Sequence, residues 1–259
     1  MEELVKYRPK FGEGVILKAE KMNELVNHAF DLPDLLYTGY TTGIISGLDI
    51  KVEDNFINIS KGIFLYEQEI YTLNQGIKIE YHPTNIWHYV KICKKETKEK
   101  IDGVQKHFVV TSDDLSTKES EIELCRFKLQ EGARLRYVYD DFEDMCTEFD
   151  TVNLINSPYS SKDKVGLHPK ILKNFAREML DLRPQNPLDT FFCIQVLGLN
   201  TTMNIEEIIR YIEIKKEENL GKVTNYTVYH HLLDILKKEK ANSKGVKKKA
   251  TPQRKILID

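Results

Sequence analysis

The spacing of apolar residues changes partway along the chain, and this change limits the folds open to it. Apolar and polar residues alternate through short segments between about residues 48 and 139, whereas apolar residues recur every three or four positions from His168 onward. Alternation predicts strands, and the longer spacing predicts amphipathic helices. Because the strands come before the helices rather than between them, the sequence predicts an α+β fold and not a parallel α/β one.

The first half is predicted to form an antiparallel β-sandwich or barrel-like shell. Residues 48–52 and 57–59 alternate on either side of a turn at Asp54-Asn55, which predicts a β-hairpin. Many further short segments without intervening helices favour the sandwich or barrel. These predicted strands are residues 63–66, 70–73, 77–81, 87–93, 107–111, 121–129 and 135–139. Residues 94–103 are predicted to be a charged loop between two of them.

Helices are predicted at both ends of this shell. Residues 1–16 lead into a helix with apolar positions at three- and four-residue spacing, which Pro33 is expected to end. Four more helices are predicted in the second half, at residues 168–182, at residues 188–199, after Asn204 and after Thr224. Short connections between them predict a compact bundle.

The sequence therefore predicts four parts. They are an N-terminal hook and helix (1–36), a β-rich shell (37–150), a helical neck or bundle (151–240) and a basic tail (241–259).

Charge is distributed unevenly along these parts. The chain has 38 Lys and Arg against 40 Asp and Glu, but residues 237–259 carry nine Lys and Arg against only Glu239 and Asp259. An acidic body with a basic tail can associate with copies of itself or with nucleic acid. The tail has no interleaved aromatic residues for base stacking, and it closes with the apolar Ile256-Leu257-Ile258. These features favour a protein-docking arm over a solubilising tail or a phosphate-binding patch.

Cysteine usage and hydropathy indicate a compartment. The four cysteines are far apart and form no CxxC pair, so neither a disulfide framework nor a zinc ribbon is expected. No run of 18 apolar residues occurs, and Glu2 and Glu3 stand where a signal peptide would carry positive charge. The sequence predicts a cytoplasmic protein, or a component of a virion or tail-like particle, with no membrane insertion.

No motif in the sequence indicates catalysis. His230 and His231 are adjacent, so they point about 100° apart on a helix and cannot share one metal ion. The acidic run at residues 140–150 lacks the pattern of a calcium loop, and indicates a solvated connector or a face for a basic partner. We expect no catalytic residue, metal or cofactor. A carbohydrate-cleaving enzyme using two acids of this run is the rival that remains open.

Two segments resemble a known family. In residues 11–25, several positions match an opening common in phage tail and baseplate proteins, namely Gly14, Leu17, Ala19, Asn23 and Leu25. Through Glu13, Gly14 and Leu17 the segment also resembles the start of the TssK family, the baseplate subunit of type VI secretion systems, with Phe11 in place of that family's opening Trp. Residues 122–129 are similar to the family's Ile-Glu-Leu-x-Arg-x-x-Leu strand.

This resemblance implies a non-enzymatic structural subunit of a contractile injection machine. It would be a trimeric adaptor that binds other baseplate subunits and links them to a membrane complex or a receptor-binding protein. A chain of 259 residues leaves no room for the family's C-terminal head domain, so the basic tail is expected to substitute for it. The alternative function is a nucleic-acid-associated binding protein that uses the tail.

Partner-binding residues are predicted at both ends of the chain. The apolar residues expected to insert into a groove of a neighbouring subunit are Leu17, Met22, Leu25 and Phe30, and Phe11 is a further partner-binding residue. The tail set is Lys247, Lys248, Lys249, Ile256 and Leu257. The apolar stripes of the helical neck could be completed by sister chains, although an ordinary intramolecular core explains them equally well.

Overall fold

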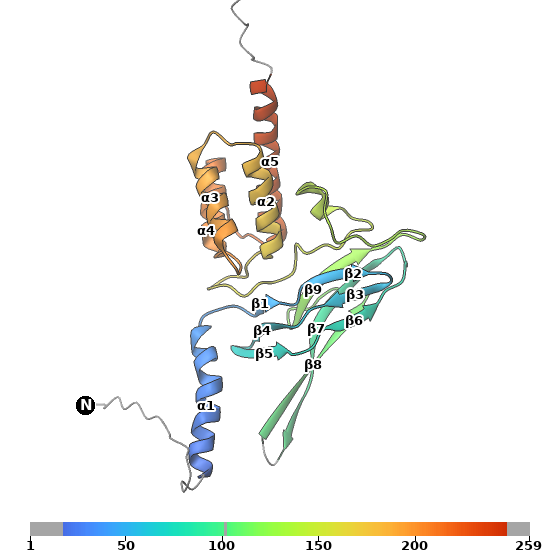
Figure 1. The fold of residues 1–259 in the computed structure, drawn as a ribbon, viewed down its shortest axis with the longest axis vertical. Helices are drawn as coiled ribbons and strands as arrows, with labels where there is room; N and C mark the ends of the chain where they lie inside the picture. Colours follow the sequence, from blue (N-terminus) through green and yellow to red (C-terminus); the bar gives the residue numbers. More distant parts are fainter. Residues whose placement is uncertain (1–17, 101–102, 248–259) are drawn as a thin grey trace, which may run out of the picture.

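The α+β class is confirmed by a computed structural model, which describes residues 18–100 and 103–247 (Figure 1). The described residues form five α-helices, one short 3-10 helix and three small antiparallel sheets. The helices are α1 (Ala19–Leu36), α2 (Pro169–Asp181), α3 (Pro187–Gly198), α4 (Ile205–Lys216) and α5 (Asn225–Lys247), and the 3-10 helix is η1 (Glu143–Cys146).

Each sheet has three strands. The first has the order β1 (Gly43–Gly47), β4 (Gly62–Tyr66), β5 (Glu69–Leu73), and the second β2 (Ile50–Glu53), β3 (Phe56–Ile59), β6 (Ile77–Glu80). The third has the order β8 (Gly103–Asp113), β7 (Trp87–Lys100), β9 (Glu121–Lys128). The predicted hairpin is confirmed as β2–β3, with Ile50 opposite Ile59. In the part of the chain that the structure describes, the sheets do not close into a barrel, so the barrel or sandwich prediction is not confirmed.

The prediction of a loop at residues 94–103 is wrong for most of its length. Strands β7 and β8 continue pairing from Lys94, opposite Phe108, to Lys100, opposite Gly103. Backbone hydrogen bonds hold this ladder, and its charged side chains project into solvent, so the segment lacks the half-buried alternation that reveals a strand. The result is a long hairpin that extends away from the helices (Figure 1).

Residues 135–139 do not form the predicted strand. Their regular pairing is limited to one bridge between Arg136 and Thr151. The Arg136 guanidinium donates to both carboxylate oxygens of Asp144, at 3.1 and 2.9 Å, and to the Thr151 hydroxyl at 3.1 Å. Side-chain bonds of this kind hold the segment in an irregular path without a neighbouring strand.

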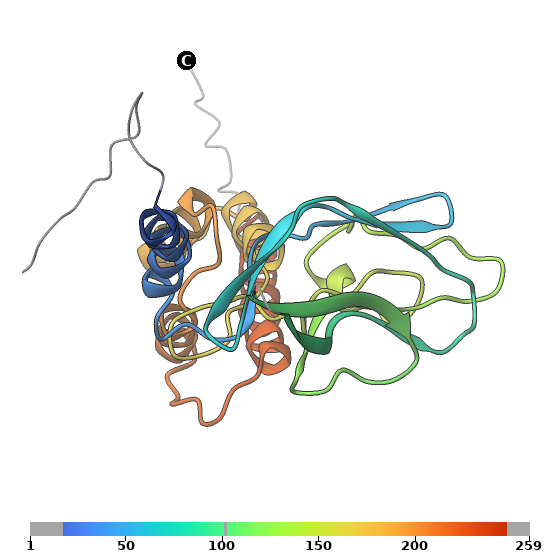
Figure 2. The same ribbon diagram turned by 90° about the horizontal axis from the view of Figure 1, so that it is seen from below.

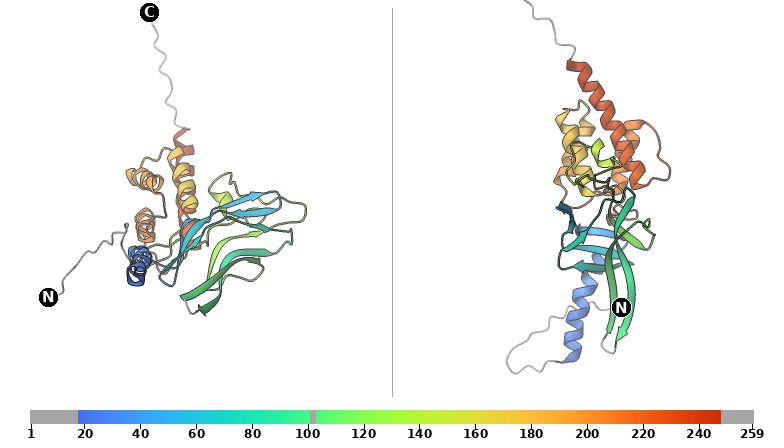
Figure 3. Two further views of the ribbon diagram at one scale, coloured as in Figure 1. Left: turned by 60° about the horizontal axis from the view of Figure 1, so that its bottom comes forward. Right: turned by 90° about the vertical axis from the view of Figure 1, so that its right-hand side faces the viewer.

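Helix α1 runs through Pro33 instead of ending there. Pro33 cannot donate to the carbonyl of Ala29, but the helix continues past it, and the carbonyl of Pro33 accepts from the N–H of Tyr37. The C-terminal end of α1 is tied to the edge strand β5, because the N–H of Ile70 donates to Asp34 at 3.2 Å. From this attachment α1 extends away from α2–α5, in the same direction as the β7–β8 hairpin (Figures 1 and 3).

The predicted caps at Asn204 and Thr224 are confirmed, and His168 and Asn186 cap α2 and α3 in the same way. The side chains of His168, Asn186 and Asn204 each accept a hydrogen bond from the backbone N–H two residues later. The Thr224 hydroxyl accepts from the N–H of Thr227 at 3.2 Å. Helix α5 continues to Lys247, past residue 241 where the tail was predicted to begin.

Helices α2–α5 lie together on one side of the sheets (Figures 1 and 2), and buried residues form a continuous core between the two halves. Phe142 is fully buried at this junction, packed against the rings of Phe175 and Tyr229. Its N–H donates to Glu178 at 2.8 Å, and its carbonyl accepts from the Tyr229 hydroxyl. The segment after the sheets is thereby fixed to both α2 and α5.

Asp189 is the one fully buried acid among the residues with described side chains. It lies in the first turn of α3 and accepts from the Tyr211 hydroxyl and from Lys215 Nζ, both at 2.7 Å and both on α4. The Tyr211 ring stacks on Phe192 with 3.9 Å between centroids. Asp189 therefore fixes how α3 packs on α4.

We expect Asp189→Ala to lower the free energy of unfolding by about 3 kcal/mol, because it leaves Lys215 without its counter-charge and Tyr211 without its acceptor. Urea titration measures this change. Asp181→Ala, which removes an exposed acid from the end of α2, should change it by less than about 0.5 kcal/mol. Equal effects of the two substitutions would contradict this account.

Candidate functional site

The strongest candidate for a functional surface is the apolar side of α1. None of the 18 residues of this helix is buried. Seven large apolar side chains are exposed on it, with Phe30 at 67% and Leu35 at 71%. The seven are Met22, Leu25, Val26, Phe30, Leu32, Leu35 and Leu36. Such a concentration of exposed apolar surface marks an interaction site.

A groove accompanies this surface where α1 meets the edge of the first sheet. It has a volume of about 660 Å³ and lies between Ala29, Phe30 and Pro33 of α1 and the strand β5. Glu69 and Lys106, which form an ion pair, add charge to its wall. Strand β5 is at the edge of its sheet, and its outer side is occupied only at the Asp34–Ile70 contact among the described residues. The groove widens the surface available to a partner beyond α1 itself.

The structure places only part of the predicted partner-binding set. Met22 and Leu25 lie on α1, exposed by 41% and 39%. Lys247 is the last residue of α5. The other members lie outside the described residues, namely Phe11, Leu17, Lys248, Lys249, Ile256 and Leu257.

Sequence reasoning missed the C-terminal part of the surface. Leu35 and Leu36 were not predicted because Pro33 was expected to end the helix, and Leu32, directly before Pro33, was not named as part of the surface. The signal was present, since the spacing of Met22 and Leu25 continues in step through Leu32 and Leu36.

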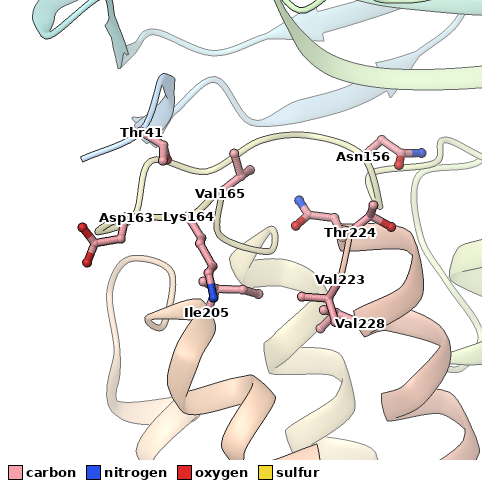
Figure 4. A pocket seen from close by; sticks show the side chains of 10 residues that line it. Thr41, Asn156, Asp163, Lys164, Val165, Ile205, Val223, Thr224 and Val228 are labelled. Atoms are coloured by element: carbon pink, nitrogen blue, oxygen red, sulfur yellow. The ribbon is translucent and has the colours of Figure 1, made fainter. Parts of the chain in front are cut away.

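A second cavity, of about 460 Å³, lies between the loop at 156–165 and the N-terminal ends of α4 and α5 (Figure 4). Its walls are largely apolar, with Val165, Ile205 and Val228 among them. Its polar groups serve the fold: Asn225 donates to the carbonyl of Gly166 at 3.0 Å, and Lys164 lies 3.6 Å from Glu206, which is outside the lining. Among the described residues that line this cavity, no nucleophilic side chain is paired with a general base.

The acidic run at 140–150 is used inside the chain. Glu143 pairs with Lys237 at 2.6 Å, and Asp141 lies 3.6 Å from Lys240, both on α5. The predicted basic partner of this run is therefore the chain's own last helix, at least for these two acids. Lys240 also pairs with Glu178. Lys237 and Lys240 therefore form ion pairs within the chain, which leaves them less available to bind phosphates.

Asp144, in the same acidic run, also pairs within the chain, with Arg136. Burial alone would raise the pKa of this carboxyl, but hydrogen bonds from Arg136 and from the backbone of Asp140 outweigh burial and lower the pKa. An ionised, hydrogen-bonded carboxylate of this kind is a structural anchor rather than a proton donor.

The other titratable candidates are also structural. Within residues 18–100 and 103–247, no three His, Cys, Asp or Glu side chains gather closely enough to hold a metal ion. His231 hydrogen-bonds to Lys216 Nζ at 2.6 Å, and His230 packs edge-on against Tyr226. Burial raises the pKa of the Cys125 thiol, and burial likewise raises that of Cys193 to about 12, so neither is a ready nucleophile.

Membrane crossing has no support from the helices. Among those described, none combines the length and the apolar character that a membrane span requires.

Comparison with known proteins yields a structural similarity but no sequence match. No protein-family model matches the chain, and no curated protein matches its sequence. Among solved structures, a crystal structure of TssK aligns with 90% of this chain and 72% of its own, with a TM-score of 0.45 and 9% identity. At these values the similarity is a loose structural relation that establishes neither family membership nor function.

His168 is a buried histidine whose pKa is strongly lowered. It caps α2, where Nδ1 accepts from the N–H of Lys170 at 3.0 Å, and its ring lies 4.7 Å from that of Tyr159. Burial, with a smaller effect of the nearby Lys170 charge, lowers the pKa of His168 to about 3. The folded protein therefore holds a neutral imidazole whose proton lies on Nε2.

This gives a pH prediction. Between about pH 6.5 and 3 the unfolded chain binds a proton at His168 that the folded chain does not, so this residue makes stability fall as pH falls through that window. In His168→Asn the cap remains and the proton site is lost. We expect the free energy of unfolding of the wild type, relative to this variant, to decrease steadily from pH 7 to pH 4.

Urea titrations at each pH measure the difference. His82→Asn, at an exposed turn position, is the control and should keep the wild-type pH dependence. Parallel curves for the wild type and His168→Asn would show that His168 does not contribute.

Proposed function

We propose that this chain is a non-enzymatic structural adaptor subunit of a contractile phage-tail-like or type VI secretion baseplate. In this role it links the baseplate wedge to a membrane complex or a receptor-binding component. The observation that carries the proposal is α1, an 18-residue helix with no buried residue and a row of exposed apolar side chains.

An exposed helix of this kind needs a partner. Isolated helices of this length are marginal in water, and most of their stability in proteins comes from packing an amphipathic face. Helix α1 is attached to the body at its C-terminal end, where Asp34 accepts from Ile70. A subunit that assembles with others explains why the chain keeps seven large apolar side chains on this helix.

The kind of assembly is suggested by the sequence resemblance. The segment at 11–25, similar to the opening of phage tail, baseplate and TssK proteins, runs into the start of α1. The segment at 122–129, similar to the family's last shell strand, corresponds to β9, after which no further strand is present in the described chain. These two resemblances support the proposal of a hook before α1 and of a shell boundary after β9.

The parts of the chain take separate roles in this proposal. The hook and helix (1–36) and the tail (241–259) are docking elements, and the shell (37–150) and the neck (151–240) form the body between them. The partners are other baseplate subunits, and the working form is a homo-trimer. The burial of Asp189 and the pairing of α3 with α4 give the neck a fixed shape on which such docking can rely.

The test is recovery of the assembly with a tagged chain expressed in its source organism. We expect the wild type to co-purify with sheath, tube and wedge proteins, and Leu25→Asp/Leu32→Asp to recover at least tenfold less, because charge on the apolar side of α1 opposes burial. Asn23→Asp/Asn27→Asp adds the same charge to the polar side and should behave as the wild type. The amounts are measured by quantitative mass spectrometry.

Two results would count against the proposal. One is a wild-type purification without any contractile-tail component. The other is equal recovery with the two double variants, which would mean that α1 is not a docking element.

A further inference from the structure

We infer that the partner of α1 is α1 of further copies of this chain, and that three or more of these helices pack in parallel as a short coiled-coil bundle. This inference rests on the proposed function, in which α1 is a docking helix, and it names the partner of that helix. It goes beyond that function in identifying the seam, its register and its symmetry.

The register of the apolar residues carries the inference. Met22, Leu25, Ala29, Leu32 and Leu36 follow one another at intervals of three, four, three and four residues. This is the heptad spacing of a coiled-coil seam, with Met22, Ala29 and Leu36 at a and Leu25 and Leu32 at d. Each of these five side chains is exposed, including Leu36 at 68%. Every a and d position from Met22 to Leu36 thus carries an apolar residue, and no described residue buries this row.

The width of the apolar side indicates how many helices meet. The e positions of the same heptads are Ala19, Val26 and Pro33, all apolar. A strict two-stranded seam uses only a and d, whereas an apolar a, d and e side suits a helix that contacts more than one neighbour. When three or more copies pack one element side by side around a single rotation axis, their α1 helices run parallel. The pattern therefore fits a cyclic bundle better than a pair.

The charges on α1 are compatible with packing against itself. Its acids occupy only c and f positions, opposite the seam: Glu24 and Asp31 at c, and Glu20 and Asp34 at f. Identical helices packed in parallel therefore bring no two acids together at the interface. Lys21 is at g, beside the seam, and faces the apolar e position of the next helix. Self-association thus carries little electrostatic cost.

The body leaves room for a neighbouring helix. The 660 Å³ groove between α1 and β5 borders the a and e positions through Ala29 and Pro33, and Phe30 forms part of its wall. Helix α1 projects beyond the sheets and away from α2–α5 (Figures 1 and 3), so most of its length of about 27 Å extends clear of the body.

A second exposed apolar surface competes as a receptor for α1. It lies on α3 and α4, with Phe191 at 68% and Ile194 and Ile214 at 60% each, beside a cavity of about 360 Å³. The exposed residues of α3 do not continue a heptad, and Arg210 and Glu207 line the cavity. The heptad row of α1 therefore fits another α1 better than it fits the α3–α4 surface. The experiment below distinguishes these two docking sites.

The experiment uses the purified full-length chain alone, so it does not depend on baseplate proteins. We expect light scattering to give a mass of three or more chains that resists high salt, because the seam is apolar. Leu25→Asp/Leu32→Asp should be monomeric, with unchanged thermal unfolding of the body, since no α1 residue is buried. Asn23→Asp/Asn27→Asp should keep the wild-type mass.

Position-specific crosslinking then tests the register. In parallel packing, identical d positions face one another, so Leu32→Cys should form crosslinked dimers with a short bis-maleimide reagent. Asn27→Cys, at an f position, and the wild type, with its own four cysteines, should form at least fivefold fewer.

Three results would overturn the inference. The first is a monomeric wild type, and the second is equal crosslinking at residues 27 and 32. The third is an oligomer that persists in Leu25→Asp/Leu32→Asp, because the contact would then lie elsewhere, for example on α3–α4. Self-association without recovery of contractile-tail proteins would overturn the proposed function and leave this inference standing.

Discussion

The fold depends on one anchor, the burial of Phe142 between the sheets and the helices. Its ring packs on Phe175 and Tyr229, its N–H donates to Glu178, and its carbonyl accepts from Tyr229. Both backbone groups are thus satisfied inside the core, where an unpaired group would be costly. Because these contacts involve both α2 and α5, the chain leaving the sheets is joined to the beginning and the end of the helical half.

This anchor also decides what the charged segments do. With Phe142 in place, the acids beside it face the lysines of α5, and Glu143 pairs with Lys237. Charges that composition would assign to an external partner are thereby used within the body. What remains for a partner among the described residues is chiefly apolar and lies on α1 and on the α3–α4 surface. A body that presents exposed apolar helices is suited to assembly.

Much of the local structure could be predicted from the sequence, because it rests on interactions between near neighbours. The β2–β3 hairpin follows from alternation around Asp54-Asn55, and the cap of α4 follows from Asn204. The errors arose where distant contacts outweigh local pattern. The charged part of β7 is held by its ladder with β8, and α1 continues past Pro33 to a turn in which Asp34 accepts from the N–H of Ile70. The apolar side of α1 was half predicted, through Met22 and Leu25, and half missed.

The sequence by itself determined the order of strands and helices, the helix caps and the heptad spacing of α1, because each depends on residues only a few positions apart. Only the tertiary structure decided which apolar rows are covered. The stripes of α2 and α5 close on Phe142 and its neighbours, whereas α1 touches the body mainly through the contact of Asp34 with Ile70. Burial is a property of the whole packing arrangement, so two helices with similar patterns can have opposite fates, one in the core and one exposed to a partner.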